Sequence, residues 1–238
     1  RIMKQILFPV LLWLISAPLV AFAQESAKEN AALIEETVAK ARAYLGGNKK
    51  LNSVSTMKLQ GVIVYGNGQS GTFDAVYKRP NYHQFISVIG NQKETSTLNK
   101  TEAWQKIERV DAPGSWELNF YGVDDLRHMQ ASVSEALSFL KTPPVRNGRI
   151  DYLGTEEVDG RQARVLSYHH GDRIWFRRYI DAETGRVLRM VNDKGVVFSE
   201  YGEKVVDGIR FPEKIVIRFL TQFGEQSMEI SYTSIVLN

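Results

Sequence analysis

The stretch GVIVYGNGQSGTFDAVYKRP, residues 61–80, decides between two fold classes. Residues 66–71 within it match the G-x-G-x-x-G pattern of a dinucleotide-binding loop, directly after an apolar run that is typical of a β-strand. Such a loop needs a helix after its third glycine, because the amides of the helix N-terminus hold the pyrophosphate. The residues after Gly71 instead alternate as in a strand, and Pro80 prevents a helix shortly afterwards. We therefore predict a hairpin turn between two strands and no nucleotide site.

The same two-residue alternation extends over most of the chain. We expect strands over residues 55–65, 72–78 and 82–89, and over nearly all of 150–237. Turn dipeptides that contain glycine separate the short segments of the second half. They are Asp159-Gly160, Thr184-Gly185, Lys194-Gly195 and Asp207-Gly208. Regular turns between short strands predict an antiparallel meander rather than βαβ units, with roughly ten strands in the whole chain.

Two segments have a helical period. In residues 25–45 the apolar positions recur three or four apart, and Gly46-Gly47 follows as a C-terminal stop. In residues 123–141 a second apolar stripe ends before Pro143-Pro144. Two amphipathic helices are few for covering one face of a large sheet. The many aromatic residues on the expected strands therefore fit either a packed core or an apolar ligand pocket.

The N-terminal residues predict export. An apolar run from Ile6 to Val20 follows Lys4 and ends at Ala21-Phe22-Ala23, which is the pattern of a cleaved secretory signal peptide. The run is shorter than the roughly 20 residues that span a bilayer, which argues against a membrane anchor. We expect residues 1–23 to be the signal peptide, residues 24–238 to form a single domain, and the protein to reside in the periplasm. The chain has no cysteine, so neither a disulfide nor acylation of an N-terminal cysteine is expected.

The charge balance does not indicate a nucleic-acid partner. The chain holds 30 Lys and Arg against 27 Asp and Glu, and the predicted signal peptide contains two of the basic residues. Nucleic-acid binding requires a concentrated positive face, for which a nearly neutral remainder gives no support.

One cluster, His169-His170-Gly171-Asp172, resembles a metal or catalytic site. Neighbouring residues in a strand point to opposite faces, so the two histidines would share a metal only if a turn bent them together. A periplasmic enzyme would require these histidines and Asp172 to converge in space. No serine nucleophile elbow is present. We expect no catalytic residue, no metal and no cofactor.

Several segments together resemble the outer-membrane lipoprotein carrier family (LolA-like). Residues 76–81, VYKRPN, lie between the glycine-rich hairpin and Phe85, and they resemble a strand of that family. Residues 99–104, NKTEAW, resemble a later strand, where a short turn precedes a tryptophan. In the second half, three stretches resemble wider relatives of the group: 157–160, 179–185 and 206–212. The order of signal peptide, helix, strands, helix and long meander also matches over nearly the whole chain.

The resemblance implies a mainly β protein with helices (α+β), an incomplete and strongly curved antiparallel β-barrel that is lidded by helices and holds an apolar cavity. The helix of residues 123–141 would be the lid. In the carriers, the arginine before the proline hydrogen-bonds the lid-helix backbone and holds the empty cavity shut; here it is Arg79. The resemblance also assigns side chains to the cavity: Phe73, Tyr77, Phe85 and Trp104 from the sheet, with Leu126, Met129, Val133 and Leu137 from the lid.

The implied function is that of a monomeric periplasmic carrier, not an enzyme, which binds acyl chains of lipoproteins or lipids and moves them towards the outer membrane. Its partners would be an inner-membrane exporter and an outer-membrane acceptor. The same scaffold occurs in periplasmic regulators that sense mislocalised lipoproteins. The alternative is therefore a sensor or interaction protein that detects lipids or lipoproteins and regulates a partner.

Overall fold

The computed structural model describes residues 16–238. The helices in this range are α1 (Ser16–Leu45), α2 (Asn48–Ser53) and α3 (Val123–Ser138). The strands before α3 are β1 (Thr56–Tyr65), β2 (Ser70–Lys78), β3 (Tyr82–Ile89), β4 (Gln92–Asn99), β5 (Glu102–Arg109) and β6 (Trp116–Phe120). The strands after α3 are β7 (Arg149–Val158), β8 (Arg161–His169), β9 (Trp175–Asp181), β10 (Val187–Asn192), β11 (Val197–Tyr201), β12 (Lys204–Val206), β13 (Ile209–Phe211), β14 (Lys214–Thr221) and β15 (Gly224–Leu237).

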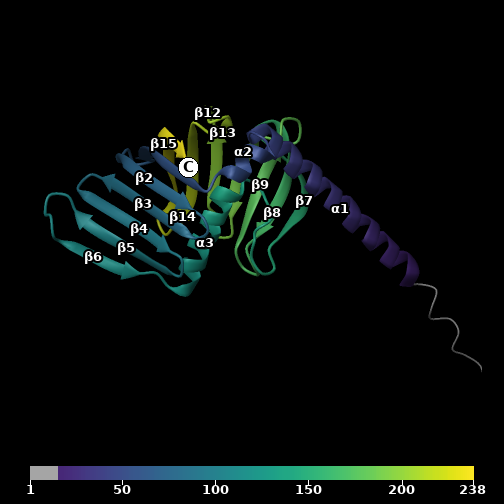
Figure 1. Ribbon diagram of the computed structural model, residues 1–238, viewed down its shortest axis with the longest axis horizontal. Helices are drawn as coiled ribbons and strands as arrows, with labels where there is room; N and C mark the ends of the chain where they lie inside the picture. Colours follow the sequence, from purple (N-terminus) through teal and green to yellow (C-terminus); the bar gives the residue numbers. More distant parts are fainter. Residues whose placement is uncertain (1–15) are drawn as a thin grey trace, which may run out of the picture.

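Thirteen of these strands form one antiparallel sheet, in the order β6-β5-β4-β3-β2-β1-β15-β14-β11-β10-β9-β8-β7. The first six strands form one meander and the later strands form a second, and the two meet where β1 pairs with β15. Strands β6 and β7 are the two ends of the sheet, which is therefore open rather than closed into a barrel. The sheet bends around α3, which lies between its two halves (Figure 1). The predicted fold class is confirmed, although the described strands number more than the roughly ten expected from turn spacing.

The stretch that resembled a nucleotide loop is the β1–β2 hairpin. The amide of Tyr65 donates to the carbonyl of Gln69 at 2.8 Å, and the amide of Gly68 donates back to Tyr65 at 2.9 Å. Gly68 has φ +86°, a conformation that glycine adopts without steric cost. The predicted turn is confirmed, because a strand and not a helix follows it.

The two faces of the sheet are set by the register. Along β1 the odd-numbered residues Met57, Leu59 and Ile63 are buried, while the even-numbered residues between them are exposed. One core lies between this face and α3. A second core lies between α1 and strands β7–β10. The concave face of the sheet is thus covered by α3 over its first half and by α1 over its second.

Both helix predictions are close to the structure at one end. Helix α1 ends at Leu45, as predicted, but begins at Ser16, within the predicted signal peptide. Residues 1–15 of that segment lie outside the described residues, so its cleavage stays a prediction. Helix α3 ends at Ser138 rather than near residue 141, because Phe139 and Leu140 adopt left-handed conformations. None of the helices in the described part of the chain is both long and apolar enough to cross a bilayer.

Candidate functional site

Aromatic side chains line the concave face of the sheet beside α3. Cross-strand pairs Ala75↔Phe85 and Gly61↔Phe73 place these residues on the face of β1 that is buried. The rings of Phe73 and Phe85 stack at 5.8 Å, and Tyr232 meets Phe73 edge-on at 6.1 Å. A Cβ atom on Gly61 would collide with the ring of Phe73, so the glycine gives this ring its space. We call Phe73, Tyr77, Phe85 and Tyr232 the aromatic floor.

Tyr77 lies at one end of the aromatic floor. Its ring stacks on that of His83 at 4.4 Å, across the β2–β3 pair. Burial raises the pKa of the Tyr77 hydroxyl to about 12, so the floor carries no negative charge from this residue at neutral pH. Burial also lowers the pKa of His83, although its hydrogen bond with the carbonyl of Val76 opposes this.

The prediction that Trp104 lines the cavity is wrong. The register pairs Phe85 with Ser96, Ser96 with Gln105, and Leu98 with Ala103. Residues 103 and 105 of β5 therefore share the concave face, and Trp104 between them points to the opposite, convex face. There it pairs with Phe120 of β6.

The lid side chains lie on the aromatic floor's side of α3. Val133 and Leu137 are each only 1 % exposed and belong to the same core as Phe73 and Leu98. Leu126 and Met129 are half-buried against that core. The middle of the concave face is therefore filled by side chains of α3.

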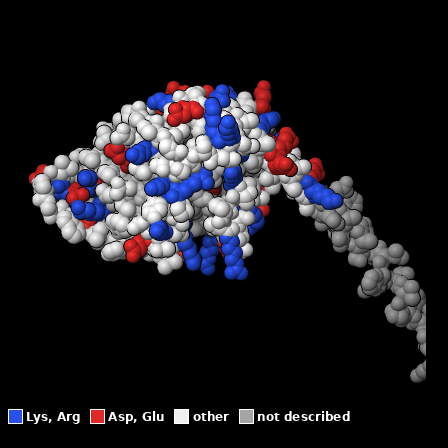
Figure 2. All heavy atoms as spheres, viewed as in Figure 1, with Lys and Arg blue, Asp and Glu red and all other residues white. Residues whose placement is uncertain are grey.

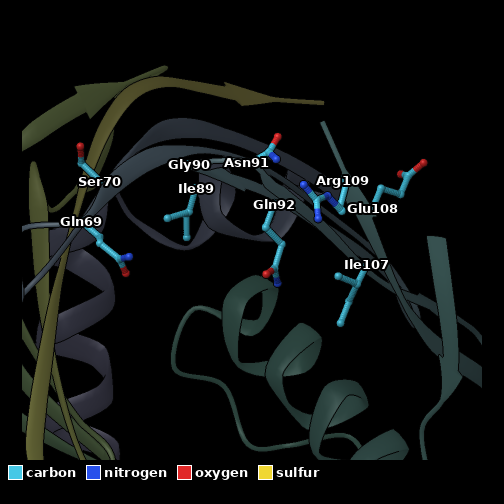
Figure 3. Close-up of a pocket in the computed structure, with 9 residues that line it drawn as sticks. All are labelled: Gln69, Ser70, Ile89, Gly90, Asn91, Gln92, Ile107, Glu108 and Arg109. Atoms are coloured by element: carbon cyan, nitrogen blue, oxygen red, sulfur yellow. The ribbon is translucent and has the colours of Figure 1, made fainter. Parts of the chain in front are cut away.

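A hollow of about 710 Å³ opens beside this core, at the ends of β2–β5. Ile89, Gln92 and Ile107 point from the sheet towards α3, whereas Glu108 points away (Figure 3). Ile107 lies opposite Glu94 in the register, and the amide of Gln105 donates to that carboxylate at 2.6 Å. The hollow thus continues the apolar surface of the concave face and has a polar rim, rather than being apolar throughout.

Arg79 connects the sheet to the lid. It follows β2 directly, and its Nη2 donates a hydrogen bond to the carbonyl oxygen of Leu137 in the last turn of α3. Its main-chain amide donates to Ser55 at 3.0 Å, which fixes the backbone at this point. The side chain is exposed. Its bond to Leu137 is partly buried, and solvent reaches the guanidinium from outside.

Arg42 of α1 binds the same end of α3, and sequence reasoning missed it. Its Nη1 donates to the carbonyls of Phe139 and Ser138, the latter at 3.1 Å. Its Nε and Nη2 donate to the side chains of Asn48 at 2.6 Å and Asn52 at 2.8 Å. The residue is 4 % exposed, and burial together with the nearby charge of Arg79 lowers its pKa. An arginine directly beside Ala41 on the apolar stripe was the available sequence signal, because charged residues are rarely buried without partners.

No family model matches this sequence, and no curated protein matches it. Solved structures do match. A DUF1329 family protein from Desulfovibrio piger superposes with a TM-score of 0.54 at 10% identity, over 86% of this chain and 93% of that one. A putative outer membrane lipoprotein-sorting protein domain from Vibrio parahaemolyticus gives 0.52 at 10% identity, with the same coverage. A LolA superfamily protein from Nitrosomonas europaea gives 0.50 at 11% identity, over 85% of this chain and 93% of that one.

The chain has the LolA-like fold. At these identities the likeness concerns the fold, and it confirms the architecture that the resemblance implied. The open LolA-like sheet and the helix in its concavity are thus established independently of any matching sequence motif.

In this LolA-like fold, the second half of the sheet holds α3 by buried charges. The Glu135 carboxylate of α3 accepts hydrogen bonds from His170 at 2.6 Å and from Arg178 of β9 at 2.6 and 3.1 Å. Burial opposes ionisation of Glu135, but Arg178 and His170 together hold its pKa below the ordinary value. The carboxylate in turn raises the pKa of Arg178, against the effect of burial. Sequence reasoning missed this cluster because Glu135 is distant in sequence from both partners.

The two histidines that resembled a metal site are used separately. His169 Nε2 lies 3.0 Å from Asp151 of β7, whereas His170 binds Glu135 from the other face of the strand. Asp172 accepts a hydrogen bond from Asn147 at 3.3 Å. His128 of α3 binds Asp193 at 2.8 Å. The three residues of the expected cluster thus bind different partners instead of converging on one point.

Proposed function

We propose that the protein is a periplasmic carrier that binds acyl chains of lipoproteins or lipids beneath α3 and moves them towards the outer membrane. The observation that carries the proposal is the Arg79–Leu137 hydrogen bond, which joins the end of β2 to α3 beside the aromatic floor. Support comes from the printed description of the Vibrio parahaemolyticus structure as a putative lipoprotein-sorting domain and from the LolA superfamily structure. The predicted signal peptide supports the compartment.

An acyl chain would replace the contacts that α3 makes with the aromatic floor. Leu126, Met129, Val133 and Leu137 cover the surface on which the chain would lie, and the hollow beside Ile89 and Ile107 is where it would enter. Burial of a chain is worth about 0.8 kcal/mol per methylene. Because one set of apolar contacts replaces another, the empty and loaded states lie close in free energy, as transfer to an acceptor requires.

The contacts of α3 determine which side opens. Removing one partner from a buried ion pair costs about 3–5 kcal/mol, and an acyl chain offers no replacement for the Glu135–Arg178 pair. Arg42 likewise holds the end of α3 with buried hydrogen bonds to the carbonyls of Ser138 and Phe139. The apolar contacts with β2–β4 are the ones that an acyl chain can replace, and the guanidinium of the exposed residue Arg79 can exchange its bond to Leu137 for water. We therefore infer that α3 stays with β7–β10 while the side next to β1–β6 opens.

A fluorescent fatty acid tests the acyl site directly. In the Ile107→Glu variant, a carboxylate enters the hollow, and we expect affinity for the probe to fall by about tenfold or more, since burying an unpaired charge is unfavourable. Thr95→Glu is the matched control, because Thr95 is paired with Lys106 on the convex face of the same strands. Equal probe binding by wild type and Ile107→Glu would contradict the proposed site.

The second candidate is a sensor or interaction protein, and the end strand β6 favours it. Trp116 is 56 % exposed and Phe120 is 75 % exposed, on the convex face with Trp104. An unpaired edge strand with exposed aromatic residues is a surface for a protein partner. A carrier would move a labelled lipid from donor to acceptor membranes, either alone or with the help of an acceptor protein in the membrane. A sensor would bind lipid and then a partner, without net transfer.

A further inference from the structure

A second groove, of about 1230 Å³, runs along α3 outside the aromatic floor. Its walls are α3, the turn of residues 79–81, the segment of residues 141–147 and the turn of residues 170–174 between β8 and β9. Among the residues that line this groove, the acyl-chain proposal uses only Arg79, Val133 and Leu137. Its walls meet at the C-terminal end of α3, next to the bonds of Arg79 and Arg42.

Basic side chains outnumber acidic ones in the groove. Five basic residues line it: Arg79, Arg127, Lys141, Arg146 and Arg173. Three acidic residues line it: Asp124, Asp172 and Asp193. Two of these acids already have partners, since Asp193 binds His128 and Asp172 binds Asn147. Lys and Arg side chains project together from the lower edge of the molecule, beneath α3 and β8, with few acidic ones beside them (Figure 2).

Most of these basic groups lack a counter-charge within the protein. Among residues 26–238, no carboxylate lies within ion-pair distance of Arg127, Lys141, Arg146 or Arg173. Partial desolvation and the charges of Arg42 and Arg79 lower the pKa of Lys141. The groove is therefore a place where positive charge accumulates without compensation, and an anion would relieve the repulsion.

Two buried polar atoms at the groove also lack partners. The hydroxyl of Ser138 and the Nδ1 atom of His170 make no hydrogen bond to any described residue, although each belongs to a residue that lines the groove. Buried polar groups are normally hydrogen-bonded, and leaving one unsatisfied costs about 1–3 kcal/mol. The Ser138 hydroxyl can donate to an anionic oxygen. An imidazole that donates from Nε2 to Glu135 keeps Nδ1 as an acceptor, so Nδ1 of His170 suits a hydroxyl of the ligand rather than an anionic oxygen.

We propose that this groove binds a phosphate group, carried by a soluble phosphate ester or by the headgroup of a phospholipid. Guanidinium groups match phosphate oxygens in geometry and bind them with two parallel hydrogen bonds. Four uncompensated basic side chains suit a phosphate group, because its anionic oxygens can accept hydrogen bonds from more than one basic side chain at once. The site does not depend on the acyl-chain proposal, because it lies outside the aromatic floor and its proposed phosphate ligands, Arg127, Lys141, Arg146, Arg173 and Ser138, take no part in the acyl site.

Calorimetric titration of the purified protein tests the groove with two probes: glycerol 3-phosphate, and dihexanoyl phosphatidylglycerol below its micelle concentration. We expect the Arg146→Gln/Arg173→Gln variant to lose about tenfold or more in affinity, and Ser138→Ala about threefold, since each removes a hydrogen bond to a charged group. The control is Lys58→Gln/Arg218→Gln, which removes the same charge from two exposed strand positions.

Each outcome of the titration decides the proposal. If the groove variant, but not the control, loses affinity for both probes, the groove is a phosphate site. If it loses affinity for the lipid alone, the site binds a lipid headgroup. If it loses affinity for glycerol 3-phosphate alone, the site binds a soluble ester. The proposal would be overturned if neither probe bound the protein. It would also be overturned if the groove variant and the control lost equal affinity. A fatty acid carries no phosphate, so its uptake reports on the acyl site separately, and either proposal can fail alone.

Discussion

Arg79 and Arg42 bind successive carbonyls at the end of α3, one from the exposed end of β2 and the other from the buried face of α1. The last carbonyls of a helix have no partner within it, so these guanidinium groups satisfy the end of the lid from two sides. Their surroundings differ, because Arg79 is exposed and Arg42 is 4 % exposed. We therefore expect the Arg79 contact to open more readily than those of Arg42.

Arg79→Leu should leave the fold intact and shift the lid towards opening. The lost bond is partly buried and contributes on the order of 1 kcal/mol to the closed state. Because a closed empty state lowers apparent affinity, the variant should bind a fluorescent fatty acid about fivefold more tightly and release it to acceptor vesicles more slowly. Lys78→Leu is the control, since Lys78 is the neighbouring exposed basic residue. Unchanged uptake and release in Arg79→Leu would remove this residue from the mechanism.

Arg42→Leu should instead destabilise the whole protein. It removes four hydrogen bonds and leaves the buried carbonyl of Phe139 without this donor, while that of Ser138 keeps the amide of Lys141; we expect the free energy of unfolding to fall by roughly 2–4 kcal/mol. Urea denaturation measures the change. Arg42→Lys should restore little of it, because an ammonium group cannot reach these partners with the fork geometry of a guanidinium. If Arg42→Leu lowered the free energy of unfolding no more than Arg79→Leu does, the two arginines would act alike.

Loading should move α3 relative to one half of the sheet only. The chain has no cysteine, so spin labels can be placed without background at Ser132→Cys on α3, Thr72→Cys on β2 and Arg177→Cys on β9, three exposed positions. With fatty acid bound, we expect the 132–72 distance to increase by about 2 Å or more, while the 132–177 distance stays fixed by the Glu135–Arg178 pair. If the 132–177 distance increased and the 132–72 distance did not, α3 would open from β7–β10 instead, which would contradict the proposal.

Glu200 should make stability decrease towards alkaline pH. Burial raises the pKa of this carboxyl from 4.5 to about 7, with Arg178 and Arg186 opposing the shift. A carboxyl with a raised pKa in the folded state favours folding below its unfolded pKa and loses that contribution as pH rises through the folded pKa. Glu200→Gln should therefore be more stable than wild type at pH 8, by roughly 1–3 kcal/mol, and equally stable at pH 4. Parallel thermal unfolding curves at both pH values measure this; an equal difference at each pH would contradict it.

Local patterns explain why much of the fold is readable from the sequence. The alternation in residues 72–78 and the missing helix after Gly71 predict the β1–β2 hairpin, and Gly46-Gly47 marks the end of α1. The early end of α3 was missed because Phe139 and Leu140 take left-handed conformations that neither residue type favours. Leu140 is nevertheless buried beneath α1, which shows tertiary packing overriding local preference.

The site was predicted less completely, for two physical reasons. Trp104 was assigned to the wrong face because the face depends on the register across successive turns, and the pair Asn99↔Glu102 places residue 103 rather than 104 on the concave side. Arg42 and Glu135 were missed because their partners lie far away in the sequence and come close only through the crossing of α3. Arg79 was found through a family resemblance, and its bond to Leu137 is present; its role as a gate stays a prediction.

The most direct measurement is native mass spectrometry of the protein purified gently from the periplasm. It tests directly whether the concave face beneath α3 holds acyl chains. We predict co-purifying mass that resolves into acylated lipid or lipopeptide, with species spaced by two-carbon units, and loss of that mass in Ile107→Glu. A bare chain that also takes up no fluorescent fatty acid would contradict the carrier proposal and leave the interaction protein in its place.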